Sequence, residues 1–140
     1  MARPLRTALA ICWAALPASV LGLLVGLIGL MTGGSVRRRG RVLEFHGGFT
    51  QRLLAKMPLG LGGACAMTLG HVVLGQTAAD LDRCRTHELV HVRQYERWGP
   101  MFLPMYLAAS AWLFALGRDP YMDNPFEREA YGQEDDADRP

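Results

Sequence analysis

Hydrophobic residues are concentrated near the N-terminus of the chain. Residues 7–36 include no charged side chain, and the apolar run at residues 7–31 exceeds the roughly 20 residues that cross a hydrocarbon layer. The apolar region of a cleaved signal peptide is shorter, at about 7 to 15 residues. We therefore predict one transmembrane helix at residues 7–31, in which Pro17 and several glycines are tolerated.

The flanks and the glycines of this run predict its orientation and its contacts. Arg37, Arg38, Arg39 and Arg41 follow the run, and Arg3 and Arg6 precede it. By the positive-inside rule, we expect a single-pass protein of the inner (cytoplasmic) membrane with its main domain in the cytoplasm and the lipid bilayer as a partner. The spacing of Gly22, Gly26 and Gly29 favours helix-mediated self-association, although chance explains it as well.

Shorter patterned segments follow. Residues 41–50 are typical of a strand that ends in a Gly-Gly turn, and residues 51–57 of a short amphipathic piece. Residues 57–76 are uncharged but contain five glycines, which argue against a long helix. We predict a strand at residues 66–75 instead.

The clearest helix is predicted from Thr77 to a stop signal at Gly99 and Pro100. Thr77 with Asp80 three residues later fits a capping box. A second apolar run, residues 101–117, is predicted to form a helix that is broken near Pro104 and packs on the domain or lies in the interface without crossing the membrane. His87, His91, Gln94, Tyr95 and Trp98 share one stripe of the first helix.

Composition limits the chain to one small domain besides the predicted span. The 140 residues divide into a transmembrane anchor at 1–36, a domain at 37–131 and a disordered acidic tail at 132–140. The formal net charge of +2 and the absence of a nucleotide-binding loop give no indication of nucleic acid or of an organic cofactor. Cys12, Cys65 and Cys84 have no zinc-ribbon or C-x-x-C spacing, so we predict no disulfide.

Two of the four histidines lie one helical turn apart on the predicted helix. His87 and His91 project from one face and can share one cation, with Glu88 beside them. Zinc binds imidazole nitrogens at about 2.0 to 2.1 Å and lowers the pKa of a bound water to about 7. A neighbouring carboxylate can take the proton of that water as it attacks a carbonyl. The alternative is that both histidines are surface residues of a structural protein.

A catalytic zinc needs a third protein ligand. Glu127 and Glu129 follow a predicted helix start, and either could instead be an ordinary carboxylate at a helix N-terminus. They lie about 200° apart around a helix, so only one can face the metal. Glu127 is preferred because Ala130 shares its face, and Glu129 would then face solvent. His71 is the next candidate.

With these residues in place, the chain resembles the gluzincin group of zinc metallopeptidases, and in size the small membrane-associated minigluzincin-like proteins of bacteria. The resemblance rests on HELVH at residues 87–91 and on Glu127 with Ala130, and covers residues 68–131. It implies an α+β fold in which an N-terminal transmembrane helix precedes a small zincin-like domain. That domain would hold a short β-hairpin, the HExxH helix, a second apolar helix and a C-terminal ligand helix.

The resemblance also assigns roles. His87, His91 and Glu127 would bind Zn²⁺, and Glu88 would be the general base. Tyr131 stands where many relatives have an aspartate that supports a zinc-bound histidine. The residue that stabilises the oxyanion stays open among His71, Tyr95, Tyr121 and Tyr131.

We therefore expect a membrane-anchored zinc metalloendopeptidase that acts on peptide or protein substrates. The alternative is a non-catalytic membrane protein whose zinc site stabilises its small domain or binds a partner.

Overall fold

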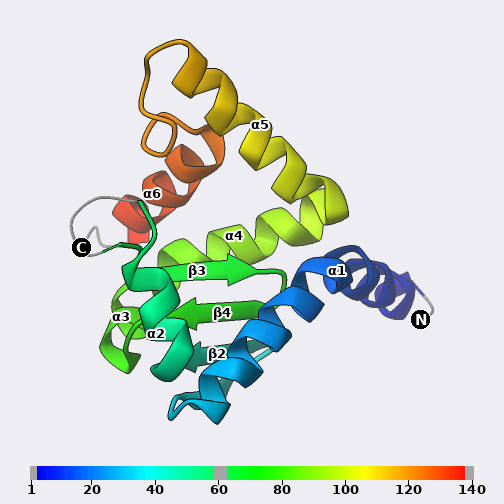
Figure 1. Cartoon of the computed structure of the whole chain (residues 1–140). Helices are drawn as coiled ribbons and strands as arrows, with labels where there is room; N and C mark the ends of the chain where they lie inside the picture. The colour runs from blue at the N-terminus through cyan, green and yellow to red at the C-terminus, as the bar shows by residue number, and fades with distance from the viewer. Residues whose placement is uncertain (1–2, 59–62, 138–140) are drawn as a thin grey trace.

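A computed structural model describes residues 3–58 and 63–137 of the chain, with side chains from residue 15 onward. Its elements are α1 (Arg3–Met31), β1 (Ser35–Arg39), β2 (Val42–His46), α2 (Gly48–Ala55), β3 (Ala66–Leu69), β4 (Val72–Gly75), α3 (Ala78–Arg83), α4 (Arg85–Trp98), the 3₁₀ turn η1 (Gly99–Met101), α5 (Phe102–Ala115) and α6 (Pro125–Ala137). The chain is thus an α+β protein (Figure 1).

The described strands form one mixed four-stranded sheet in the order β1-β2-β4-β3. β1 and β2 are antiparallel, as are β3 and β4, while β2 and β4 run parallel at the centre. The segment predicted as one strand at residues 66–75 is in fact a hairpin. Gly70, with a φ of 64°, forms its turn together with His71, because glycine adopts positive φ without steric cost.

Helices cover both faces of the sheet (Figure 1). Val72 and Leu74 of β4 point towards one face, where they pack in a core with Phe45 and Leu54 beneath α1 and α2. Val73 points to the opposite face and packs with Val42, Leu81 and Val92 beneath α3 and α4. This alternation is the period of two that a strand buried on both sides requires.

No helix among the residues that the structure describes is long and apolar enough to cross a membrane. The prediction of a transmembrane helix at residues 7–31 is therefore wrong, and so is the predicted location as a single-pass protein of the inner membrane. Residues 1–2 of the predicted anchor lie outside the described residues, as do the side chains of residues 3–14.

The glycines of α1 give the physical reason for this correction. A Cβ atom at Gly22 would lie 2.7 Å from Val72 of β4, and one at Gly26 would lie 2.6 Å from the Phe45 ring of β2. Because Gly22 and Gly26 have no side chain, α1 can approach the sheet of its own domain closely. Figure 1 shows α1 crossing over the strands.

The arginines after α1 also have partners within the domain. The prediction treated them as a basic membrane flank, but residues 35–39 form strand β1. Arg37 makes ion pairs with Glu44 and Asp82, which lie on β2 and α3. Only the folded chain brings these carboxylates to Arg37, so its role was not visible in the local sequence.

Two helix predictions need smaller corrections. The helix predicted from Thr77 is two helices, because the chain turns at Cys84 between α3 and α4. The cap at Thr77 is confirmed, since its hydroxyl accepts a hydrogen bond from the Asp80 amide. The helix at residues 102–115 is continuous, and Pro104 lies in its first turn, where a missing N–H leaves no hydrogen bond unmade.

The C-terminal helix begins as predicted and ends later. Asn124 accepts a hydrogen bond from the Phe126 amide and Pro125 is the first helical residue, which confirms the predicted start. Residues 132–137 are helical, so the predicted disordered tail is wrong there, and residues 138–140 lie outside the described residues. Gln133 accepts a hydrogen bond from Arg93 of α4, which ties this extension to the domain.

Candidate metal centre

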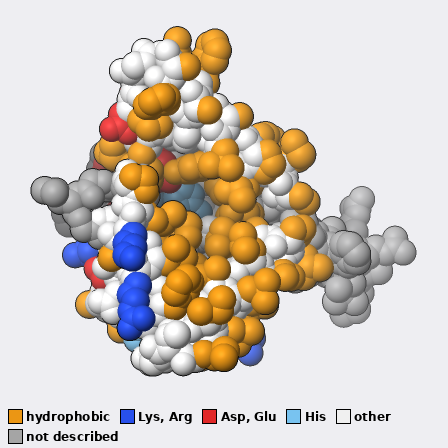
Figure 2. All heavy atoms as spheres, in the orientation of Figure 1, with side chains coloured by type: hydrophobic (Ala, Val, Ile, Leu, Met, Phe, Trp, Pro, Cys, Tyr) orange, Lys and Arg blue, Asp and Glu red, His pale blue; other side chains and the backbone are white. Residues whose placement is uncertain are grey.

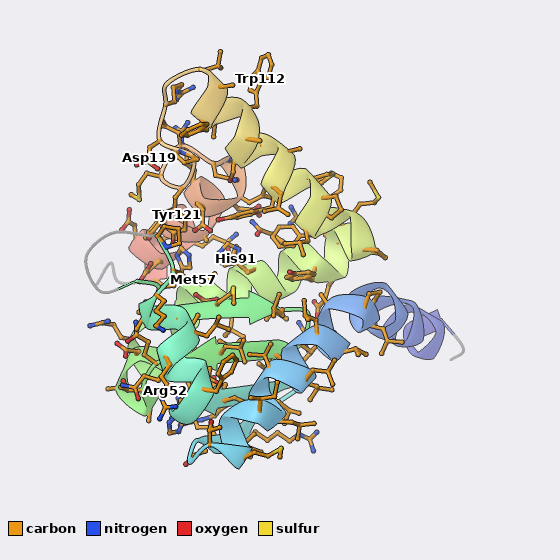
Figure 3. All side chains as sticks on the ribbon, in the orientation of Figure 1. Arg52, Met57, His91, Trp112, Asp119 and Tyr121 are labelled. Atoms are coloured by element: carbon orange, nitrogen blue, oxygen red, sulfur yellow. The ribbon has the colours of Figure 1, made fainter. Side chains whose placement is uncertain are left out.

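His87, His91 and Glu127 converge at the contact between α4 and α6. The histidines project from one face of α4, and Glu127 lies in the first turn of α6 directly opposite. All three side chains are buried. Figure 3 shows His91 pointing into the space that α4, α5 and α6 enclose.

Distances within the group fit one metal ion. His87 Nε2 lies 3.0 Å from Glu127 Oε2 and 3.2 Å from His91 Nε2, and His91 Nε2 lies 3.4 Å from Glu127 Oε1. Two ligand atoms at about 2.0 to 2.1 Å from a tetrahedral zinc are separated by about 3.3 Å. The three residues therefore form a buried group that could hold a metal ion, as the sequence predicted for these positions.

Gln94 orients His91 for this role. Its amide nitrogen donates to the Phe126 carbonyl and to Glu129, so the amide oxygen is turned towards His91 Nδ1 at 2.8 Å. In the neutral imidazole that a metal requires, Nδ1 then carries the proton, and the lone pair of Nε2 faces the group. The prediction that Glu129 faces solvent is wrong, because this half-buried carboxylate accepts from Gln94 and pairs with Arg97.

His87 has a different environment. The ring of Tyr131 packs edge-on against its imidazole, with 4.5 Å between the ring centroids. His87 Nδ1 has no hydrogen-bond partner within the described part of the chain, but Glu134 Oε2 lies 3.4 Å away. Glu134, one turn beyond Tyr131, thus brings a carboxylate to the imidazole.

Glu127 is ionised in this environment. Burial alone would raise the pKa of its carboxyl group, but hydrogen bonds from His87, His91 and Tyr106 outweigh burial and lower the pKa to about 2. Tyr106 of α5 donates its hydroxyl to Oε1 at 2.7 Å. One anionic carboxylate between two imidazoles is a donor set that suits a divalent cation.

The histidines titrate in the opposite direction. Burial lowers the pKa of His91, but its interactions with Glu127 and Glu88 raise it to about 9. Burial lowers the pKa of His87 as well, but its hydrogen bond with Glu127 and the charges of Glu88 and Glu127 together raise that pKa above its ordinary value. Without a metal, the protons on the two histidines therefore balance the negative charge of the buried carboxylates.

Glu88 lies beside the three ligand candidates without belonging to their group. Its carboxylate is buried and accepts a hydrogen bond from Thr68 of β3 at 2.6 Å. Burial raises the pKa of Glu88, an effect that the nearby His91 and the Thr68 hydroxyl only partly offset. This raised pKa brings the carboxyl group closer to the range in which it can accept and return a proton near neutral pH.

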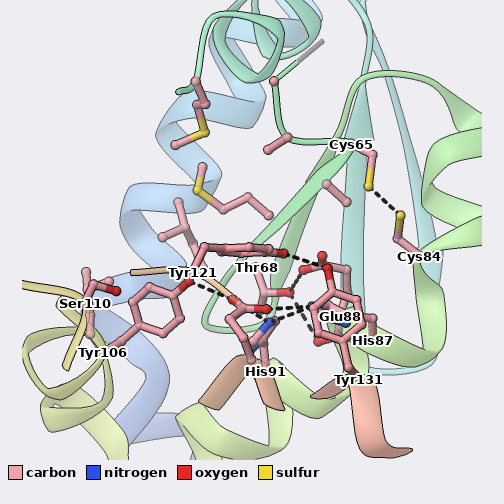
Figure 4. Close-up of a pocket in the computed structure, with 18 of the residues that line it drawn as sticks. Cys65, Thr68, Cys84, His87, Glu88, His91, Tyr106, Ser110, Tyr121 and Tyr131 are labelled. Atoms are coloured by element: carbon pink, nitrogen blue, oxygen red, sulfur yellow. Dashed lines mark hydrogen bonds and ion pairs between the residues drawn. The ribbon is translucent and has the colours of Figure 1, made fainter. Parts of the chain in front are cut away.

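A cavity of about 720 Å³ opens onto these residues. Thr68 and Leu69 of β3 form one wall, and Leu103, Leu107 and Tyr121 lie on the side of α5 and the segment after it. Figure 2 shows histidine at the base of a hollow rimmed by hydrophobic side chains, and Figure 4 shows the polar residues that meet there. The group is therefore buried but reachable.

None of the remaining predicted candidates belongs to the group of three ligand candidates. His71, the alternative third ligand, lies 3.0 Å from Glu96 and not at the metal centre. Tyr95 lines the cavity and packs against Phe102 in a core cluster. Tyr121 and Tyr131 also line the cavity, with 3.3 Å between their hydroxyl oxygens.

Four residues of the site were missed by sequence reasoning. They are Thr68, Gln94, Tyr106 and Glu134. Gln94 carried a usable signal, since it lies on the stripe of His91 three residues later and is an unusual residue for a buried helix face. The others come from distant segments, so no local pattern identifies them.

The chain matches no protein-family model, no curated protein and no solved structure.

Proposed function

We propose that this protein is a zinc-dependent peptidase in which His87, His91 and Glu127 hold the metal. The observation that carries the proposal is the buried group of these three residues, whose separations suit zinc, with the carboxylate of Glu88 directly beside it. A bound zinc would act as a Lewis acid towards a substrate carbonyl and lower the pKa of a coordinated water.

In this proposal Glu88 moves the proton. Its carboxylate takes a proton from the attacking water and returns it to the nitrogen of the departing amine. The raised pKa of Glu88, caused by burial, favours the protonated form that the second step needs. Thr68 positions the carboxylate through its hydrogen bond.

Tyr121 and Tyr131 are our candidates for stabilising the oxyanion. Both hydroxyl groups line the cavity, and burial raises the pKa of each. They consequently keep their protons at neutral pH, and whichever hydroxyl accepts the hydrogen bond of the other can donate its own to a developing negative charge. Tyr106 is less suited, because its hydroxyl already donates to Glu127.

The proposed substrate is an extended peptide segment. β3 is an edge strand of the sheet, and its residues Met67, Thr68 and Leu69 line the cavity. An edge strand offers backbone N–H and C=O groups that can pair with a further strand. The apolar neighbours Leu103 and Leu107 suit hydrophobic side chains next to the cleaved bond.

The test is hydrolysis of a mixture of unstructured peptides by the full-length protein, followed by mass spectrometry. We expect cleavage that a zinc chelator abolishes and added zinc restores. Glu88→Gln should bind as much zinc but cleave about 10² to 10⁴ times more slowly. Glu96→Gln is the matched control, because Glu96 lies on the same helix but pairs with His71 and Arg41. Equal cleavage by wild type and Glu88→Gln would refute the proposal.

A structural zinc site is the second candidate. The close packing of α4 on α6 around the buried group favours it, because a metal there would join two helices of a small domain. Stoichiometric zinc without any peptide cleavage, together with loss of folding on chelation, would support this reading over catalysis.

A further inference from the structure

We propose that Cys65 and Cys84 form a reversible disulfide, closed by a hydroperoxide, that ties the edge strand β3 to the start of α4. Cys65 directly precedes β3, and Cys84 directly precedes α4. Their sulfur atoms lie 2.6 Å apart, and both residues are half-buried free thiols (Figure 4).

The two sulfurs need little backbone movement to join. A formed bond has an S–S distance of about 2.05 Å, and two thiols can be bridged only where their side chains already face each other. Both cysteines line the cavity. A small oxidant that enters the cavity can therefore reach them.

The position of the pair indicates what the bond would do. Thr68 lies three residues after Cys65, and Glu88 lies four residues after Cys84, and these two side chains are hydrogen-bonded to each other. β3 and α4 are thus joined at two successive points, first by the cysteines and then by Thr68 and Glu88. A disulfide between the cysteines would therefore hold Thr68 and Glu88 in position for their hydrogen bond.

The chemistry balances with a hydroperoxide as oxidant. The Cys65 thiolate attacks one peroxide oxygen, the O–O bond breaks, and Cys65 becomes a sulfenic acid while hydroxide leaves and is protonated. The Cys84 sulfur then attacks the Cys65 sulfur, which forms the S–S bond and expels a second water. The two thiols lose two electrons and two protons, and hydrogen peroxide becomes two waters.

Neighbouring groups favour Cys65 as the first nucleophile. Its pKa is lowered to about 6, chiefly by a hydrogen bond from Cys84 and further by Arg83, against the opposing effect of burial. The pKa of Cys84 is raised by the same hydrogen bond and by burial. The more reactive thiolate and the resolving thiol are therefore distinct.

The experiment treats the full-length protein with hydrogen peroxide, alkylates the remaining thiols and digests with trypsin. We expect residues 57–83 linked to residues 84–85, release of this link by dithiothreitol, and Cys12 alkylated in both states. Cys12→Ser is the control that keeps both partners and should form the same link. Alkylation of both Cys65 and Cys84 after peroxide, or a link that includes Cys12, would overturn the proposal.

A second measurement tests the tie between β3 and α4. The oxidised protein should unfold at a midpoint about 10 °C higher than the reduced protein, because the bond closes a loop of the unfolded chain. Cys84→Ser treated with peroxide should show no such rise. An unchanged midpoint in a fully cross-linked sample would contradict the proposed role of the bond. Neither measurement depends on peptide hydrolysis, so the proposed peptidase activity can fail while this proposal stands.

Discussion

Glu127 meets three polar partners at the site, which are the imidazoles of His87 and His91 and the hydroxyl of Tyr106. Glu127→Ala should leave two histidine ligands. Loss of a residue that only hydrogen-bonds to a ligand weakens metal binding by roughly 10- to 100-fold, and loss of Glu127 itself should weaken zinc binding by more than that. Glu129→Gln is the control, since glutamine still accepts from Gln94. Competition titrations with a chromophoric chelator measure the zinc affinity of both variants. If Glu129→Gln loses the metal and Glu127→Ala keeps it, the assignment of the ligand is incorrect.

The titration of His91 gives a pH dependence for metal uptake. Its pKa is raised to about 9 in the metal-free protein, because interactions with Glu127 and Glu88 exceed the effect of burial. Zinc needs the neutral imidazole, so binding at pH 7 should release a proton and the apparent affinity should rise with pH up to about 9. Calorimetry in two buffers of different ionisation enthalpy measures this release. Identical heats in both buffers would contradict it.

The same shifts set the stability of the metal-free protein. A raised histidine pKa stabilises the fold fully below the unfolded value of 6.5, and this contribution is lost as pH rises through about 9. The lowered pKa of Glu127 stabilises the fold above the unfolded value of 4.5, and this contribution is lost as pH falls through about 2. Both contributions are therefore complete only between pH 4.5 and 6.5.

At the scale of elements, the length of α6 decides whether the Nδ1 atom of His87 has a carboxylate neighbour. Glu134 lies 3.4 Å from Nδ1 of His87 because the helix continues beyond Tyr131. Glu134→Gln should weaken zinc binding by about 10-fold, as expected when a residue that contacts a metal ligand, but not the metal, loses its charge. Asp135→Asn removes the same charge from an exposed position on the same helix and should have little effect. The same competition titration compares them, and equal affinities for the two variants would exclude a role for Glu134.

Local signals in the sequence were sufficient for parts of these elements. His87 and His91 share a face because a helix repeats every 3.6 residues, and the starts at Thr77 and Asn124 follow from side chains that cap the adjacent turn. These predictions succeed because each depends on residues within one or two turns.

Other elements depend on contacts that no local pattern contains. Strand β1 consists largely of arginines, and its Arg37 is neutralised by Glu44 and Asp82 only after folding. The end of α6 is likewise supported by Arg93 and His87 of another helix, so an acidic sequence that resembles a disordered tail is helical. Identification of Glu134 from the sequence failed for this reason.

At the scale of the whole molecule, α1 is a packed helix of the domain. Its apolar composition resembles that of a membrane span, but its glycines lie against the sheet. Apolar composition alone does not distinguish a lipid neighbour from a protein neighbour. The close approach at Gly22 and Gly26 makes the distinction, and it is visible only with both partners in place.

This packing predicts different outcomes for two glycine substitutions. Gly26→Ala should lower the free energy of unfolding by about 1 to 3 kcal/mol, because the added methyl group would meet the Phe45 ring. Gly132→Ala in α6 should be neutral or stabilise by about 0.5 to 1 kcal/mol, since a Cβ there meets no neighbour within 4 Å. Urea unfolding measures the free energy of unfolding of both variants. A Gly26→Ala protein as stable as Gly132→Ala would show that α1 does not pack on the sheet.

The metal content of the purified full-length protein tests the central claim most directly. After removal of all metal and reloading with excess zinc, followed by desalting, elemental analysis should find one zinc per chain. His91→Ala should retain little of it, whereas His71→Ala should retain it fully, because His71 lies against Glu96 and away from the group. A folded wild-type chain that holds no zinc, or a His91→Ala variant that holds as much as the wild type, would contradict the assignment of His87, His91 and Glu127 as the metal ligands.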